Sequence, residues 1–218
     1  NDIGATKTNG TTTVEQAVKH FLDYAHCNAD AEIIFRASDM ILQTDSDAAY
    51  LVAPRARSRA GGYHYLGSKD TNLFNNAFYV LATIIKNVMS SAMEAEVAAL
   101  YENAQKVIEF RQVLEDMGHP QPQTIIRTDN KTACGILNGT MKQKRSKAID
   151  MRFWWLKGKI NDHKEFMIRW AKGTENLADY PTKHHAPSHH LRVRPIYLYQ
   201  KGKSPRTLQG CAEILNSN

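Results

Sequence analysis

Residues 39–50 read DMILQTDSDAAY, an apolar run that leads into two aspartates, Asp45 and Asp47. The apolar part is typical of a buried strand. Because side chains alternate between the two faces of a strand, Asp45 and Asp47 are predicted to point to the same side. Two like charges on one face at the end of a buried strand repel each other, so their surroundings must compensate for that repulsion.

The rest of the chain predicts an α/β domain with a mixed sheet and helices on its faces. A short amphipathic helix comes first, followed by three strands, a helix, a strand, two helices, a strand and a last short helix. The expected helices are residues 13–27, 90–120, 130–139, 146–160 and 174–185, the last broken at Pro181, and the expected strand regions are 31–45, read as two strand-like stretches, 61–68, 76–88, 123–129 and 165–173.

Composition favours a soluble globular protein with an anionic partner. Of the 218 residues 42% are hydrophobic and 23% are charged, and the formal net charge is +6. The positive excess is local, which indicates nucleic acid as a partner, with a solvated basic face as the alternative. The candidates for phosphate contacts are Arg57, Arg59, Lys142, Lys144, Arg145 and Lys147.

Four acidic residues fall at matching ends of the expected elements. Asp47 ends the first long strand, Glu96 lies in the first turns of the long helix, Asp129 ends the strand TIIRTD, and Asp179 lies in the short helix after the last strand. Acids in these places can converge on one edge of a sheet. Several carboxylates side by side cannot all stay ionised without compensation. Divalent cations such as Mg²⁺, which take oxygen ligands, would provide it.

Each acid also has a structural interpretation. Glu94 fits a capping box with Ser91, which leaves Glu96 as the metal-facing acid of that helix. Asp129 can cap the helix that follows it, and Asp179 can be a solvated acid near a helix start.

Six motifs in order make the chain resemble a known family. They are SDAAY (46–50), ARSRAGGYHYLG (56–67), SSAMEAEVAAL (90–100), TDNKTACGILNG (128–139), RSKAIDMRFWWLK (145–157) and NLADYPTKHH (176–185). Together they are similar to the ribonuclease H domain of copia-type LTR-retrotransposon Pol polyproteins, over about residues 11–185. In that family's pattern the first catalytic aspartate matches Asp47 rather than Asp45, and the glutamate matches Glu96.

The resemblance implies an RNase H-like three-layer α/β/α fold around a five-stranded mixed sheet. It implies a Mg²⁺-dependent ribonuclease H that hydrolyses the RNA strand of RNA–DNA hybrids during reverse transcription. Two Mg²⁺ ions, for which Mn²⁺ can substitute, would be held by Asp47, Glu96, Asp129 and Asp179. The loop WAKGTEN lacks the histidine that many cellular relatives carry before the last aspartate, and Lys172 is its nearby cation.

The resemblance also implies a context. Residues 1–30 are expected to be a linker and helix from the end of the reverse transcriptase region, 31–185 the RNase H-like domain, and 186–218 an extension of unclear structure. The chain begins with Asn1, which suggests a piece of a larger polyprotein or a trimmed chain. The expected partners are an RNA–DNA hybrid and the reverse transcriptase part of the same polyprotein, with no membrane, in a cytoplasmic virus-like particle or the nucleus.

Two other functions stay open at this point. One is a catalytically decayed or non-catalytic nucleic-acid-binding domain of the same fold. The other is an integrase or transposase core acting on DNA. The order of the acids argues against the latter, because such a core places its glutamate last, whereas here the glutamate comes second.

Overall fold

The computed structural model describes residues 2–5, 10–69, 75–141 and 150–199. Its strands form one sheet in the order β3-β2-β1-β4-β5. β2 pairs antiparallel with β1 and β3, whereas β4 runs parallel to both β1 and β5. The strands are β1 Ile41–Ala53, β2 Arg57–Gly67, β3 Ala77–Ile84, β4 Thr124–Thr128 and β5 Phe166–Trp170.

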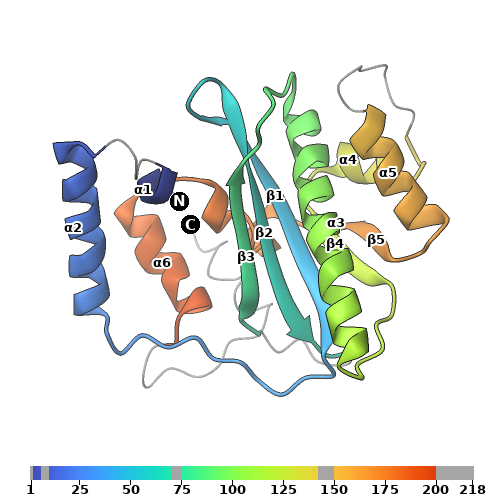
Figure 1. Ribbon diagram of the computed structural model, residues 1–218, viewed down its shortest axis with the longest axis horizontal. Coiled ribbons are helices and arrows are strands. Elements are labelled where there is room, and N and C mark those ends of the chain that lie inside the picture. The colour runs from blue at the N-terminus through green and yellow to red at the C-terminus, as the bar shows by residue number, and fades with distance from the viewer. Residues whose placement is uncertain (1, 6–9, 70–74, 142–149, 200–218) are drawn as a thin grey trace.

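Helices cover both faces of this sheet (Figure 1). Leu42 of β1 and Phe166 of β5 pack with α3, α4 and α5 in the main core, while Tyr63 and Tyr65 of β2 pack against α6 on the opposite face. This is the predicted RNase H-like α/β/α arrangement. The helices are α1 Asp2–Ala5, α2 Thr12–Cys27, α3 Ala92–Asp116, α4 Lys131–Leu137, α5 Asp150–Asn161 and α6 Pro187–Tyr197, and the 3₁₀ turns are η1 Gly173–Glu175 and η2 Tyr180–Thr182.

Some parts of the chain differ from the sequence prediction, among them the predicted helix 174–185, where the structure has only the turns η1 and η2. Residues 31–40 contain no strand, only an isolated bridge between Glu32 and Tyr199. The side chains of Asn75 and Asn76 bond to the backbone of this segment, so its polar groups are paired without a neighbouring strand. In the region 186–218, where the sequence shows no clear periodicity, α6 buries Val193 and Ile196 against the sheet.

α2 stands beside α6 and away from the sheet (Figure 1). The Tyr24 hydroxyl lies 3.2 Å from Nε2 of His190 on α6. None of the helices formed by the described residues is both long enough and apolar enough to cross a bilayer. The predicted division of the chain at residues 30 and 185 stays a prediction.

The central strand buries a run of polar side chains. Thr44, Asp45 and Ser46 have no exposed surface, and Asp47 is 2% exposed. They are buried because helices cover both faces of β1. Because successive side chains of a strand point to opposite faces of the sheet, the four residues form two pairs. Thr44 and Ser46 face α3, where they bond to His64 and Asn103, whereas Asp45 and Asp47 face the α6 side, as the sequence predicts.

Asp45 forms an ion pair within the sheet. The Arg127 guanidinium on β4 donates to one carboxylate oxygen over 2.5 Å, and the Leu177 backbone N–H donates to the other over 3.0 Å. Arg127 also donates to the Tyr65 hydroxyl over 2.8 Å. The Asp45 network therefore fastens the segment that leads to Asp179 onto the central strand.

Replacing Arg127 with leucine is expected to lower the free energy of unfolding by about 3–5 kcal/mol, because Asp45 would be left as a buried carboxylate without its cation. Urea unfolding followed by circular dichroism measures the change. Arg169→Leu, at an exposed position of β5, is the matched control and should change stability by less than about 0.5 kcal/mol. Equal effects of the two substitutions would contradict the role of this ion pair.

Candidate metal site

Asp47 lies on β1 opposite Gly61 of β2. Its carboxylate accepts a hydrogen bond from the Thr182 hydroxyl over 2.7 Å. A Cβ atom on Gly61 would lie 2.2 Å from Cγ2 of Thr182 and 2.7 Å from the Ala178 carbonyl oxygen. Glycine at position 61 is thus required for the segment 178–182 to approach β2 and reach Asp47.

Glu96 projects from the first turns of α3 and is 6% exposed. Its carboxylate accepts hydrogen bonds from the Ala48 backbone N–H and, over 3.4 Å, from the Thr128 hydroxyl. Glu94 behaves differently, as predicted. Its N–H donates to the Ser91 hydroxyl over 3.2 Å, and its carboxylate accepts from the backbone N–H of Ser90 over 2.9 Å, so it caps the helix start.

Asp129 directly follows β4 and is partly buried. The cap of α4 is Asn130, whose side-chain oxygen accepts from the Ala133 N–H over 2.9 Å, so Asp129 is released from the capping role that the sequence also allowed. The Trp170 indole donates to the Asp129 carbonyl over 2.9 Å and fixes the backbone there. A Cβ on Gly173 would lie 2.9 Å from the Asp129 carboxylate, so that loop also comes close.

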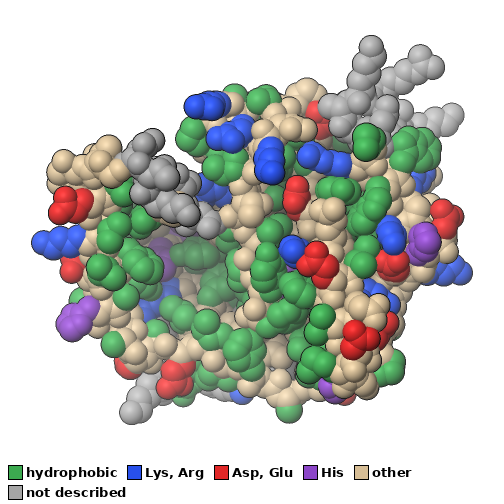
Figure 2. All heavy atoms as spheres, in the orientation of Figure 1, with side chains coloured by type: hydrophobic (Ala, Val, Ile, Leu, Met, Phe, Trp, Pro, Cys, Tyr) green, Lys and Arg blue, Asp and Glu red, His purple; other side chains and the backbone are tan. Residues whose placement is uncertain are grey.

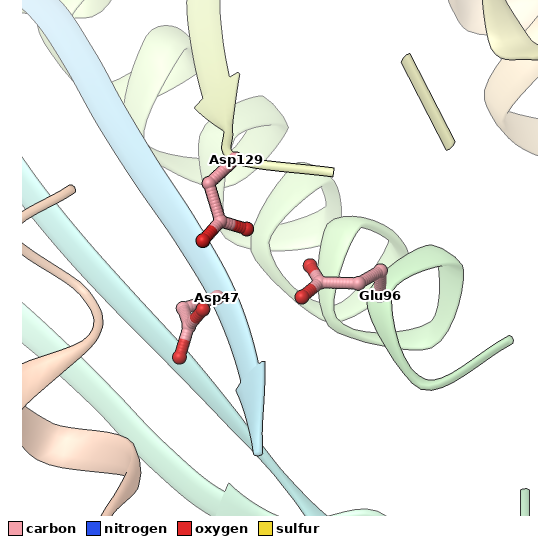
Figure 3. A group of neighbouring side chains, drawn as sticks. All are labelled: Asp47, Glu96 and Asp129. Atoms are coloured by element: carbon pink, nitrogen blue, oxygen red, sulfur yellow. The ribbon is translucent and has the colours of Figure 1, made fainter. Parts of the chain in front are cut away.

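The three side chains converge at one end of the sheet (Figure 3). One carboxylate oxygen from each of Asp47, Glu96 and Asp129 lies within 4.8 Å of the other two. Burial, reinforced by the charges of Asp47 and Asp129, raises the pKa of Glu96 to about 9. Burial likewise raises the pKa of Asp47 to about 6. The group is a set of hard oxygen donors whose ionised form is disfavoured by burial and mutual repulsion, and such a set can hold a divalent metal ion.

Asp179 stands beside this group but is not one of its members. It precedes η2, instead of lying in a continuous helix, and its carboxylate accepts a hydrogen bond from the Lys183 ammonium. The charge of Asp179 still contributes to raising the pKa of Asp47 and of Asp129, and Lys183 opposes that effect. The cation at the site is therefore Lys183, which the sequence analysis missed although it lies four residues after Asp179. Lys172, the cation expected from sequence, is exposed.

The predicted nucleic-acid contacts are only partly within the described residues. Arg57 begins β2, and its Nε donates to the Pro54 carbonyl over 3.2 Å. Figure 2 shows Lys and Arg side chains gathered around the β1–β2 turn, at the top of the view. Arg59 is 7% exposed and lines a cavity of about 540 Å³ together with Lys183. The remaining candidates, Lys142, Lys144, Arg145 and Lys147, lie outside the described residues.

Comparison with known proteins identifies one relative of this sequence. The chain is 28% identical over 170 residues to the retrovirus-related Pol polyprotein from transposon TNT 1-94 of Nicotiana tabacum. The chain resembles a retrotransposon Pol polyprotein. The match covers 77% of this chain but only 12% of that polyprotein, so this chain corresponds to a small part of its length. The chain matches no protein-family model.

Solved structures that are similar to this chain include RNase H domains. LC11-RNase H1, isolated from compost, matches with a TM-score of 0.49 and 16% identity, over 65% of this chain and 92% of that one. The same protein in complex with an RNA/DNA hybrid matches with a TM-score of 0.48 and 16% identity, over 64% and 91% of the two chains. The N-terminal RNase H domain of a Mycobacterium tuberculosis protein matches with a TM-score of 0.46 and 11% identity, over 63% and 92%.

The raised pKa values predict how stability depends on pH without metal. Between the ordinary pKa of glutamate, about 4.5, and the folded value of about 9, the folded chain keeps a proton on Glu96 that the unfolded chain has released. The raised pKa of Glu96 therefore makes its full contribution to stability below pH 4.5. The free energy of unfolding then falls as the pH rises toward 9. Urea unfolding in EDTA at a series of pH values measures this slope.

Glu96→Gln should flatten that slope and make the metal-free protein more stable than the unaltered chain at pH 8. Glu94→Gln is the matched control, because glutamine still caps a helix start and position 94 lies outside the acidic group. If Glu96→Gln and the unaltered chain lose stability in parallel between pH 5 and 9, then Glu96 is not a repelled, buried acid.

Proposed function

We propose that this chain is a metal-dependent endonuclease that hydrolyses the RNA strand of RNA–DNA hybrids during retrotransposon reverse transcription. The observation that carries the proposal is the meeting of three carboxylates from β1, α3 and the end of β4, positions 47, 96 and 129, at a site where burial and repulsion raise their pKa values. Such an arrangement is costly in an empty protein, and a divalent cation relieves that cost.

The residues fit Mg²⁺ better than a softer metal. All three donors are carboxylates, and neither histidine nor cysteine belongs to the group among the described residues. Mg²⁺ prefers oxygen donors and keeps part of its water shell. Bound there as a pair of ions, Mg²⁺ would supply charge that activates water as the nucleophile and stabilises the leaving 3′ oxygen.

The chain's own residues hold and orient this donor set. The Thr182 hydroxyl fixes one oxygen of Asp47, and the Ala48 N–H and Thr128 hydroxyl fix Glu96. Asp179 is held by Lys183 at the edge of the group, so it can join the donor set only if its carboxylate exchanges Lys183 for the metal. Lys183 would then be free to contact a phosphate of the bound strand.

The substrate class follows from charge and shape. The net charge of +6 and the basic side chains around the β1–β2 turn favour a polyanion. Contacts of Arg57, Arg59 and the basic segment 142–147 to phosphates would position a duplex without reading its sequence. Selection of the RNA strand would come from hydrogen bonds to 2′-hydroxyl groups across the wide minor groove of the hybrid.

Asp47→Asn should abolish cleavage of a labelled RNA–DNA hybrid while leaving the fold intact. Loss of a residue that merely supports a metal ligand already costs about 10- to 100-fold, so loss of the ligand itself should exceed about 100-fold. The assay compares Mg²⁺ with EDTA and the hybrid with duplex DNA, using circular dichroism to verify folding. Hybrid binding without any cleavage by the unaltered chain would favour the alternative, a non-catalytic nucleic-acid-binding domain.

The two glutamates at the start of α3 provide a matched pair. Glu96→Gln should lower the cleavage rate by more than about 100-fold, because it removes a ligand charge. Glu94→Gln should stay within about 3-fold of the unaltered chain, because the capping hydrogen bonds survive in an amide. Equal losses from both substitutions would show that Glu96 has no special role in the reaction.

A further inference from the structure

Four buried polar side chains connect the central strand to α3 on the face of β1 opposite Asp47. Thr44, Ser46, His64 and Asn103 are all fully buried, with 0% exposure. Apolar residues at these positions would satisfy the alternation of the strands and the inward stripe of the helix. Burying polar groups instead is costly unless every one of them is paired, so the pairing itself requires an explanation.

The direction of the hydrogen bonds that link Asn103, His64 and Thr44 can be determined. The Asn103 side-chain nitrogen lies 2.8 Å from the Gly61 carbonyl oxygen and 3.0 Å from the Ala99 carbonyl oxygen. Carbonyls only accept, so the atom facing them must be the amide nitrogen. Oδ1 of Asn103 then faces Nε2 of His64 over 3.0 Å, so Nε2 carries the hydrogen. Nδ1 of His64 is left as an acceptor for the Thr44 hydroxyl, 3.0 Å away.

These hydrogen bonds connect the helix of Glu96 to the strand of Asp47. Asn103 lies seven residues after Glu96, two turns along the same face of α3. Its amide nitrogen lies 3.0 Å from the hydroxyl of Ser46, the neighbour of Asp47, and it contacts the carbonyl of Gly61, which pairs with Asp47 across the sheet. A shift of α3 along the sheet would break these bonds together.

The Asn103 side chain fits against β2 only because residue 62 is glycine. A Cβ atom on Gly62 would lie 1.8 Å from Oδ1 of Asn103. Burial lowers the pKa of His64 to about 4, so the ring is neutral at physiological pH. A neutral ring has one donor and one acceptor nitrogen, as the bonds to Asn103 and Thr44 require.

We propose that Asn103 and His64 are positioning residues, which set the register of α3 on the sheet and thereby hold the Glu96 carboxylate against that of Asp47. Neither residue touches the acidic group. The inference rests on the proposed metal site. It adds that side chains on the opposite face of β1 hold that site in place. Supports of this kind tune metal affinity although they make no bond to the metal.

The test is metal affinity rather than activity, measured by calorimetric titration of the full chain with Mn²⁺. The double substitution His64→Phe with Asn103→Leu removes the hydrogen bond between the two side chains, and it is expected to lower the free energy of unfolding because the Thr44 and Ser46 hydroxyls lose their partners. We expect Mn²⁺ affinity to be weaker than in the unaltered chain by several-fold, up to about 10-fold, which is the lower end of the cost of losing a residue bonded directly to a metal ligand. A positioning role also predicts a lower kcat for hybrid cleavage with an unchanged KM.

Gln121→Leu is the matched control. Gln121 lies just before β4 and contacts the start of β1, at the end of that strand away from Asp47. Gln121 also ties β1 through its amide, because its oxygen accepts from the Leu42 N–H and its nitrogen donates to the Met40 carbonyl, both over 2.9 Å. This substitution should lower the free energy of unfolding. It should leave Mn²⁺ affinity within about 2-fold of that of the unaltered chain, because Gln121 contacts neither the acidic group nor the residues that support it.

Each outcome decides the question. A folded double variant that binds Mn²⁺ as tightly as the unaltered chain overturns the positioning role. If the double variant is unfolded by circular dichroism, Thr44→Val is titrated instead, because it removes only the hydroxyl that donates to His64. Several-fold weaker binding supports the inference, and unchanged binding overturns it. An unaltered chain that binds no Mn²⁺ would overturn the metal site itself, together with this inference.

Discussion

The structure depends on the burial of four consecutive polar side chains, Thr44 to Asp47, in its central strand. Helices on both faces exclude water from β1, so each side chain must find its partner inside the protein. Asp45 is neutralised by Arg127, while Thr44 and Ser46 join the network of His64 and Asn103. Asp47 accepts a hydrogen bond from Thr182, and burial raises its pKa to about 6 although Lys183 opposes that effect. The proposed metal site uses this carboxylate.

The same constraint explains why distant parts of the chain meet where they do. Partners for the buried polar run come from β2, β4, α3 and the segment 176–182, so pairing the run also fixes the arrangement of these elements. Leu177 and Asn176 bond to Asp45 and to the Ser46 carbonyl, which brings Asp179 beside the acidic group. In this view the network that stabilises the fold and the geometry of the metal site have one origin.

Much of the fold could be predicted from sequence because its signals are local. The apolar run before Asp45 and the cap at Ser91 each follow from backbone chemistry within a few residues, whereas α4 is capped by Asn130 and not by Asp129, which the sequence also allowed. Glu94 lies in the capping position at the helix start that the sequence predicts for it. Residues 31–40 were wrongly predicted as strand, because a β-branched run indicates extended backbone but cannot show whether a partner strand is available.

The parts that sequence could not supply are pairings over long separations. His64 looks like an isolated polar residue in a strand, and only its contact with Asn103, 39 positions away, shows its role. α6 was missed because two prolines and four histidine or arginine residues hide its short apolar stripe. Lys183 could have been found from its spacing of four residues from Asp179, although that spacing alone does not show that the pair lies beside Asp47.

The most direct measurement is an anomalous difference map from crystals of the full chain grown with Mn²⁺. If the three carboxylates form a metal site, a peak is expected within about 2.5 Å of oxygens from Asp47, Glu96 and Asp129. A map with no peak there at saturating Mn²⁺, or one in which the three carboxylates point away from one another, would contradict the proposed metal site.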